Sequence, residues 1–408
     1  LPRLSPQRRA ERHERLRRGF SAAVSYAVEH GARLFLVAGN LFDSPTPSNL
    51  ERAFVASELA RLRRAGVTCV AVSGSHDTPR ANAEQGAESP LRLYDALEGL
   101  DYFAPGQTLI PRLYAFDDLS VALLGLSGNP APPPASDPLV GITIEDPGDV
   151  LGRADVSLLL AHAGIEGAAP PNGRERVIRQ ASLKSLPPSV RLVVAGQGRQ
   201  FSQQRVDERE LIATGATERM DFEIPANTSG FVWIELAASG VTCVSHVSVP
   251  EQPRADITLE TEGLLPVPTP QATMLEPSAP TDELANRETA KMPAGIQRAL
   301  AKACTPETMV RLRLVGHIAR ADLRRLAIRD IIRAGQRAFS FDLDTSGLIP
   351  IEPDRAPQAM GMASLSPTQE VKLLLAERLA SLADPDAREL RAAADLLLAR
   401  LQTREDAR

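Results

Sequence analysis

The feature that most constrains the fold is a strand, helix and strand pattern near the start of this 408-residue chain. The strand-like run RLFLVA (33–38) is followed by a helical segment and then by the apolar run VTCVAVS (67–73). Ser48 and Glu51 have the spacing of a capping box at the start of the helix, and Gly66 fits its end. Strand, helix and strand in this order form a right-handed crossover between parallel strands. The pattern therefore predicts an α/β domain.

Further apolar runs extend this prediction to about residue 250. Three of them, at 121–126, 157–163 and 191–196, have the near-continuous apolar character of buried strands. The runs at 230–236 and 240–249 are separated by a short turn and predict a closing antiparallel hairpin. Together they predict a layered α/β domain over residues 1–250.

The rest of the chain divides into two smaller parts. A proline-rich stretch (264–280) is typical of a linker. Within 251–350, the pattern at 308–344 predicts a small α+β capping module with β-α-β order. Residues 351–408 predict two amphipathic helices with leucine stripes. The expected organisation is thus a main domain, a capping module and a C-terminal helical tail that binds a partner.

Bulk composition excludes several classes of protein. The net charge is −5, so the chain is not globally basic, and its 46 basic residues are nearly all arginines. Its three cysteines form no CxxC pair, which argues against a zinc finger or a disulfide scaffold. Cys69 and Cys243 lie in apolar runs and are expected in the core. With no secretory signal and no apolar run near 18 residues, a cytoplasmic protein without membrane spans is expected.

Polar clusters follow four of the predicted strands directly, at 39–43, 74–77, 162–167 and 196–200. In open α/β sheets, ligands bind at the carboxyl ends of the strands. The coincidence of four such loops predicts a functional site where they meet.

The same four loops resemble those of the calcineurin-like metallophosphoesterases, whose motifs read GDxxD, GNHD, a strand-terminal His and GHxH. The corresponding stretches here are Gly39-Asn40-Leu41-Phe42-Asp43, Gly74-Ser75-His76-Asp77, His162 and Gly196-Gln197-Gly198-Arg199. Two further stretches, DSPTPS (43–48) and TGATERMDF (214–222), resemble the SbcD-type nuclease subunit of bacterial double-strand-break repair. The resemblance covers roughly residues 7–345. It implies a β-sandwich flanked by helices.

The resemblance also implies two-metal phosphodiester hydrolysis, usually with manganese. At the family's ligand positions stand Asn40, Ser75, His162, Gln197 and Arg199, and only His162 is the expected residue type. An amide brings no charge to offset two dications, and a guanidinium has no lone pair to offer. The metal site is therefore expected to be lost, with no cofactor in this protein.

Two catalytic positions of the family keep their residue types. His76 resembles the acid that protonates the leaving group, and Asp77 resembles the carboxylate that orients it. The family's first motif, Asp-x-His, is expected either to lie before Leu1 or to be absent.

The expected partners also follow from the resemblance. The arginine-rich segment 3–18 is a candidate for contacts with double-stranded DNA, through Arg8, Arg9, Arg12 and Arg15. A solvated helix face is the alternative. The tail helices resemble the region that docks on the coiled-coil base of an SbcC-type ATPase, and intramolecular packing is the alternative. A homodimer is a further option.

Three functional hypotheses remain open at this stage. The first is a non-catalytic SbcD-like subunit that keeps its DNA and ATPase contacts. The second is an active manganese-dependent nuclease with a rearranged site. The third is an interaction module on a phosphoesterase fold with no role on DNA. Manganese content separates the first from the second, and salt-sensitive DNA binding separates the first from the third.

Overall fold

The computed structural model describes residues 4–79, 88–128, 136–168, 176–261, 292–319, 323 and 326–351. The chain divides into two compact units, residues 1–349 and 350–408. The predicted linker and both predicted tail helices lie outside the described residues. The first unit is a mixed α/β structure.

The predicted crossover is confirmed. Strand β1 (Leu34–Ala38), helix α2 (Asn49–Arg64) and strand β2 (Thr68–Val72) follow one another, and the two strands pair in parallel. Both bonds of the capping box form: the Ser48 hydroxyl accepts from the Glu51 N–H, and the Glu51 carboxylate accepts from the Ser48 N–H at 2.8 Å. Strand β3 (Asp101–Phe103) then extends the sheet beside β2.

A six-stranded sheet forms the centre of the main domain, in the order β12-β13-β11-β8-β6-β5. Its strands β6, β8, β11 and β13 are parallel, whereas β5 and β12 run antiparallel to their neighbours. The expected apolar runs form β6 (Ser120–Leu126), β8 (Val156–Ala161) and β11 (Val190–Ala195). The other three strands are β5 (Arg112–Ala115), β12 (Phe201–Val206) and β13 (Arg209–Thr214).

Short elements connect these strands. Two small parallel ribbons pair β4 (Thr108–Leu109) with β7 (Thr143–Ile144), and β9 (Gly164–Ile165) with β10 (Val177–Ile178). Helix α4 (Val150–Arg153) precedes β8, and the 3-10 helix η1 (Gln180–Ser185) leads toward β11. The candidate pockets described below lie among these connections.

The core is layered. One cluster lies between the three-stranded and six-stranded sheets and joins Val70 to Leu123, Leu158 and Leu192. The residues next along these strands point to the opposite face of the six-stranded sheet and form a second cluster, as the period of two in a strand requires. A third cluster packs the helices on the outer face of β1-β2-β3.

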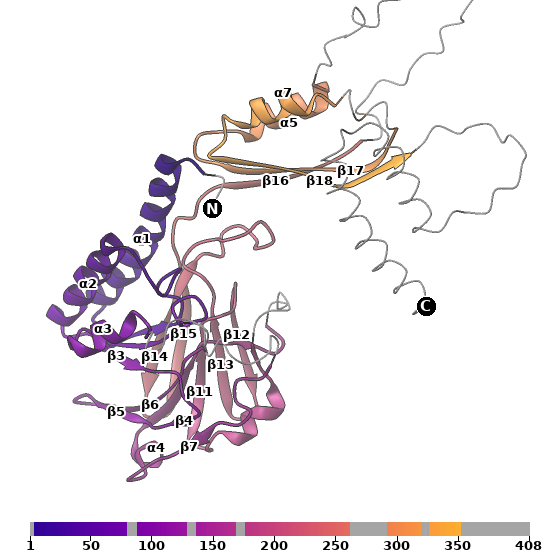
Figure 1. The fold of residues 1–408 in the computed structure, drawn as a ribbon. Coiled ribbons are helices and arrows are strands. Elements are labelled where there is room, and N and C mark those ends of the chain that lie inside the picture. The colour runs from indigo at the N-terminus through magenta and orange to yellow at the C-terminus, as the bar shows by residue number, and fades with distance from the viewer. Residues whose placement is uncertain are drawn as a thin grey trace, which may run out of the picture. The chain divides into compact units, whose positions relative to one another are not determined.

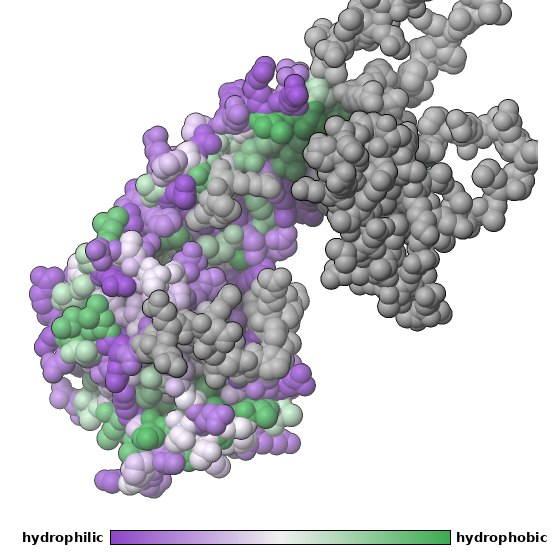
Figure 2. Space-filling model, in the orientation of Figure 1, coloured by the Kyte–Doolittle hydropathy of each residue, from purple (hydrophilic) through white to green (hydrophobic). Residues whose placement is uncertain are grey.

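Three helices cover that outer face: α1 (Pro6–Glu29), α2 and α3 (Leu91–Ala96). Helix α3 buries Leu91 and Tyr94. Figure 2 shows a hydrophobic patch over α3, where Leu93 and Leu97 are 48% and 65% exposed.

The predicted hairpin is also confirmed, as antiparallel strands β14 (Gly230–Ala237) and β15 (Gly240–Ser248). Its residues Val232, Ile234 and Val244 pack against the cluster between the sheets. Cys69 is buried as expected, but the expectation for Cys243 was wrong because its side chain is exposed. In a strand, the neighbour of the inward-facing Val244 must face the other way.

The module after residue 253 has its own core. It contains β16 (Arg254–Glu260), α5 (Ala294–Ala303), β17 (Met309–Ala319), α7 (Ile328–Gly335) and β18 (Ser340–Ile351). The expected β-α-β order is found in β17, α7 and β18, while β16 and α5 were not anticipated. Figure 1 shows α5 and α7 on one face of the β16-β17-β18 sheet. Among the described residues, no helix has both the length and the apolarity needed to cross a membrane.

Candidate functional site

The four polar loops predicted from the sequence meet at the carboxyl ends of β1, β2, β8 and β11. The Asn40 side-chain oxygen accepts a hydrogen bond from the His76 N–H at 3.0 Å, which joins the first two loops. The His162 Nδ1 lies 2.9 Å from the Ala38 carbonyl oxygen. The Gly196 N–H donates to the Ala161 carbonyl at 3.0 Å and brings in the fourth loop. The carboxyl ends of neighbouring strands thus gather the loops into one loop cluster.

Glycines permit this close approach. At Gly39, φ is +90° and an added Cβ would lie 2.2 Å from the His162 Nδ1. At Gly74, an added Cβ would lie 2.1 Å from the Asn40 side-chain oxygen. Asn40 itself has a φ of +54°, a left-handed conformation that asparagine tolerates better than most residues. The loop geometry therefore selects glycine and asparagine for reasons of space and backbone angle.

Asp77 holds the first two loops together from inside. Its carboxylate is fully buried and accepts hydrogen bonds from the Leu41 N–H at 2.8 Å and from the Gly74 N–H. Burial raises the pKa of Asp77 to about 6, and these backbone donors oppose that rise. Through this carboxylate, Asp77 links the backbones of the first and second loops. Among the described residues, no hydrogen bond joins it to the His76 ring.

The carboxylate beside His76 is Asp43. The His76 Nδ1 lies 3.1 Å from an Asp43 carboxylate oxygen, and both side chains are largely exposed. The hydrogen bond to Asp43 raises the pKa of His76, and the same bond lowers the pKa of Asp43. The hydrogen-bond partner of the His76 ring in this structure is thus Asp43, and the orienting role expected for Asp77 stays a prediction. His76 and Asp43 are 33 positions apart in the sequence, and the parallel pairing of β1 with β2 places their loops side by side.

His162 is held as a neutral imidazole. Its side chain is 3% exposed, and burial lowers its pKa to about 4. Because a carbonyl oxygen only accepts, Nδ1 donates its proton to Ala38, which leaves Nε2 with a lone pair. This buried Nε2 has no hydrogen-bond partner among the described residues. A neutral imidazole with a free lone pair is the form that binds a metal.

The other family ligand positions do not complete a metal centre. The Asn40 oxygen already accepts from His76, Ser75 is exposed, and Arg199 forms an ion pair with Asp221 at 2.6 Å. Gln197 lies in the fourth loop, where its N–H donates to the Ala163 carbonyl. Within the described part of the chain, no three His, Cys, Asp or Glu side chains gather as a metal site. The donor set therefore does not fit two divalent cations, which need a negative bridging ligand.

The four arginines expected on DNA lie on α1 in different environments. The prediction that Arg12 contacts DNA was wrong, because its side chain is 1% exposed and cannot reach a phosphate outside the protein. Its guanidinium forms an ion pair with Glu218 at 3.1 Å and donates to the Gln252 side-chain oxygen at 2.9 Å.

The other three arginines remain closer to the surface. Arg15 pairs with Glu307, and Arg8 donates to the Gln336 carbonyl oxygen at 3.2 Å. Arg9 is exposed. Two of these arginines, Arg8 and Arg15, thus contact the module after residue 253.

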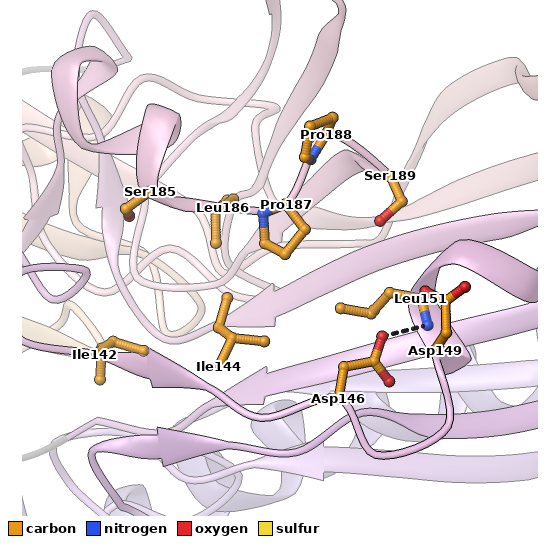
Figure 3. A pocket seen from close by; sticks show the side chains of 10 residues that line it. All are labelled: Ile142, Ile144, Asp146, Asp149, Leu151, Ser185, Leu186, Pro187, Pro188 and Ser189. Carbon is orange, nitrogen blue, oxygen red and sulfur yellow. Dashed lines mark hydrogen bonds between the residues drawn. The ribbon is translucent and has the colours of Figure 1, made fainter.

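A pocket of about 580 Å³ lies away from the loop cluster. Figure 3 shows its lining, which includes Asp146, Asp149 and Leu151 on one side and Leu186 and Pro187 on the other. These residues precede β8 and β11, so the pocket lies at the amino ends of strands whose carboxyl ends carry the loop cluster. Asp146 accepts hydrogen bonds from the N–H groups of Val150 and Leu151. The pocket takes no part in the site predicted from the sequence.

Comparison with known proteins gives weak similarities. No protein-family model matches the chain, and no curated protein matches it. A Staphylococcus aureus protein assigned as a 5'-nucleotidase, crystallised with alpha-ketoglutarate, is 13% identical with a TM-score of 0.29, over 55% of this chain and 47% of that one. The chain thus spans about half the length of that protein. GAP50, the anchor in the inner membrane complex of Plasmodium, is 11% identical with a TM-score of 0.31, over 53% of this chain and 84% of that one. At these TM-scores, neither similarity carries an argument about fold or function.

Proposed function

We propose that this protein is a non-catalytic SbcD-type subunit of a DNA double-strand-break repair complex. In this proposal it has a layered metallophosphoesterase fold that has lost its two-metal site, works in the cytoplasm and acts through contacts with an ATPase partner and with DNA. The observation that carries it is the state of the family's ligand positions. An amide, a hydroxyl, an amide and a guanidinium stand at Asn40, Ser75, Gln197 and Arg199.

Electrostatics explains why these replacements matter. Two dications a few ångströms apart repel one another strongly, and a bridging carboxylate offsets that repulsion. The neutral Asn40 supplies no such charge. Arg199 adds a positive charge at the same loop cluster, and its ion pair with Asp221 removes one nearby carboxylate from metal binding.

The chemistry that remains is incomplete. The pair of His76 and Asp43 can hold and release a proton, because the carboxylate stabilises the charged imidazole. Proton transfer to a leaving group still requires an attacking nucleophile. In the family a metal supplies that nucleophile by lowering the pKa of bound water. Without a bound metal, the loop cluster has no activated nucleophile for hydrolysis, and the proposed role of the protein is to bind its partners.

The first experiment measures metal binding and nuclease activity together. Manganese is titrated calorimetrically into the full chain, and blunt duplex DNA is tested as a substrate with and without manganese. We expect no stoichiometric manganese binding and no cleavage above background. Restoring the family residues with Asn40→Asp, Gln197→His and Arg199→His is the informative comparison. Gain of metal binding in this variant alone would attribute the loss to these three positions.

The active nuclease is the second candidate, favoured by the unpartnered Nε2 of His162 and by the pair of His76 and Asp43. It makes the opposite prediction. Micromolar binding of manganese, with cleavage abolished by His76→Ala, would establish the nuclease and refute the proposed function. A third outcome, with neither cleavage nor salt-sensitive DNA binding, would favour an interaction module unrelated to DNA.

The ATPase contact is tested through the predicted tail helices, which lie outside the described residues. Leu375→Asp with Leu397→Asp places charges in both leucine stripes and should abolish co-purification with a cognate SbcC-type ATPase. Ala376→Asp with Ala392→Asp is the matched control, because at 100° per residue these positions lie off the stripes. Equal co-purification of both variants would assign the stripes to intramolecular packing.

A further inference from the structure

A second pocket, of about 530 Å³, has a different chemical character from the loop cluster. It lies where residues 136–140, after β6, meet β10 and η1. Its polar lining comprises Ser136, Asp137, Arg176, Arg179 and Ser182. Strand β9, which pairs with β10, begins two residues after His162. Two guanidinium groups and two hydroxyl groups thus line one concave surface with a single carboxylate.

That carboxylate is engaged by the backbone. Asp137 is 9% exposed, and its two oxygens accept hydrogen bonds from the N–H groups of Leu139 and Arg179, each at 2.9 Å. These bonds join the residue 136–140 segment to the end of β10. Among the described residues, neither Arg176 nor Arg179 forms an ion pair with a carboxylate. Asp137 therefore shapes the pocket and leaves an excess of one positive charge.

The two arginines have donors to spare. The Arg176 Nε donates to the Ser136 hydroxyl at 3.3 Å, which leaves the two terminal amino groups of its guanidinium for another acceptor. Burial lowers the pKa of Arg176, and the nearby charge of Asp137 opposes that effect. Arg179 is exposed, and its guanidinium has no hydrogen-bond partner in the described part of the chain. An anion in the pocket would supply the acceptors that both guanidinium groups lack.

We propose that this pocket binds a phosphate group through Arg176 and Arg179, with Ser136 and Ser182 as hydroxyl donors. The planar guanidinium matches the oxygens of a phosphate and can donate two parallel hydrogen bonds to it. The phosphate belongs either to a nucleic-acid backbone or to a small phosphorylated molecule. The pocket uses no residue of the loop cluster and no residue of the tail; only its nucleic-acid alternative rests on the proposed function, because it would supply a DNA contact.

The test compares two double variants of the full chain. Arg176→Gln with Arg179→Gln removes both charges from the pocket. Arg153→Gln with Arg191→Gln removes two exposed charges elsewhere and serves as the matched control. Inorganic phosphate is titrated calorimetrically into each protein, and a labelled DNA duplex is titrated by fluorescence anisotropy at several salt concentrations. Thermal unfolding of each variant verifies that it is folded.

We expect the pocket variant to lose about tenfold or more in affinity, while the control stays within about twofold of the wild type. Loss of phosphate binding alone identifies a small phosphorylated ligand. Loss of duplex binding, with the slope of log affinity against log salt reduced by about 2, identifies a nucleic-acid backbone. The proposal is overturned if the wild type binds neither probe, or if both variants lose affinity equally. Because manganese is absent from these titrations, a nuclease result under the proposed function does not decide this one.

Discussion

Arg12 offers the sharpest test of how the structure is held together. Its guanidinium is 1% exposed, and it pairs with Glu218, which is 3% exposed. It also donates to Gln252 and to the Arg219 carbonyl oxygen, each at 2.9 Å. Gln252 in turn donates to the Glu307 carbonyl oxygen at 3.3 Å. Replacing Arg12 with methionine keeps most of the side-chain volume but leaves a buried carboxylate without its cation.

The magnitude follows from the burial of both partners. Breaking a buried ion pair by removing one partner costs about 3–5 kcal/mol. One neighbour moderates this figure. Burial and then the positive charge of Arg12 lower the pKa of Arg254 to about 10, so removing Arg12 relieves some repulsion. We therefore expect Arg12→Met to cost about 3 kcal/mol, the low end of that range, and to lower the Tm of the first unit, residues 1–349, by roughly 4 °C.

The assay is thermal unfolding of the full chain, followed by circular dichroism, for a double-mutant cycle of Arg12→Met and Glu218→Gln. The two substitutions together should cost less than the sum of the single effects, with a coupling of about 2 kcal/mol. Arg9→Met is the matched control on the same helix, because Arg9 is exposed, and it should change stability by less than about 0.5 kcal/mol. A Tm for Arg12→Met within about 1 °C of the wild type, or strictly additive effects of the two substitutions, would refute a stabilising role for the ion pair between Arg12 and Glu218.

Two further predictions concern the loop cluster, and a third concerns the strands beneath it. Burial raises the pKa of Asp77 from 3.8 to about 6, so between these pH values the folded state binds more protons than the unfolded state. The free energy of unfolding should therefore fall by about 3 kcal/mol as pH rises from 3.8 to about 6. Denaturant unfolding of the wild type and of Asp77→Asn measures this, and a difference in stability between the two proteins that does not change with pH would contradict it. Gly39→Ala should cost about 2 kcal/mol or more of stability, because the added Cβ would clash with His162. The control is Gly31→Ala, where φ is also positive (+65°) but no atom lies within 4 Å of the added Cβ, and it should cost only about 1 kcal/mol. Equal costs would argue against the close approach of Gly39 to His162. Chelation should leave the Tm unchanged, because the buried apolar strands need no cation, and a drop of several degrees would reveal a structural metal.

Much of the local structure follows from short-range patterns in the sequence. The crossover of β1, α2 and β2 was predicted because its capping box, its glycine stop and its apolar strands agree with one another. The hairpin of β14 and β15 was predicted because only a short turn separates two apolar runs. The gathering of four loops was predicted because parallel strands present their carboxyl ends along one edge.

Elements with weaker patterns escaped prediction. Strand β12 reads FSQQRV and, among the described residues, lies at the edge of its sheet, and its four central polar residues give little apolar signal. Strand β16 alternates intermediate and exposed residues for the same reason. Helix α5 follows a long proline-rich segment, and its residues Ile296 and Leu300 are buried because they pack in the cluster of the β16-β17-β18 sheet, which their local sequence does not indicate.

The residue types were readable from the sequence, but their partners were decided by tertiary structure. The resemblance predicts metal-ligand positions at Asn40, Gln197 and Arg199, and the weak donor chemistry of these residues can be read from the sequence because it is a property of each side chain. It cannot show that His76 meets Asp43, or that Asp77 faces inward to the backbone, since both depend on how the two loops curl after their strands. The same arginine-rich sequence places Arg12 in the interior and Arg9 at the surface. Burial and pairing are properties of the packed chain, because each requires a second segment that lies distant in sequence and close in space.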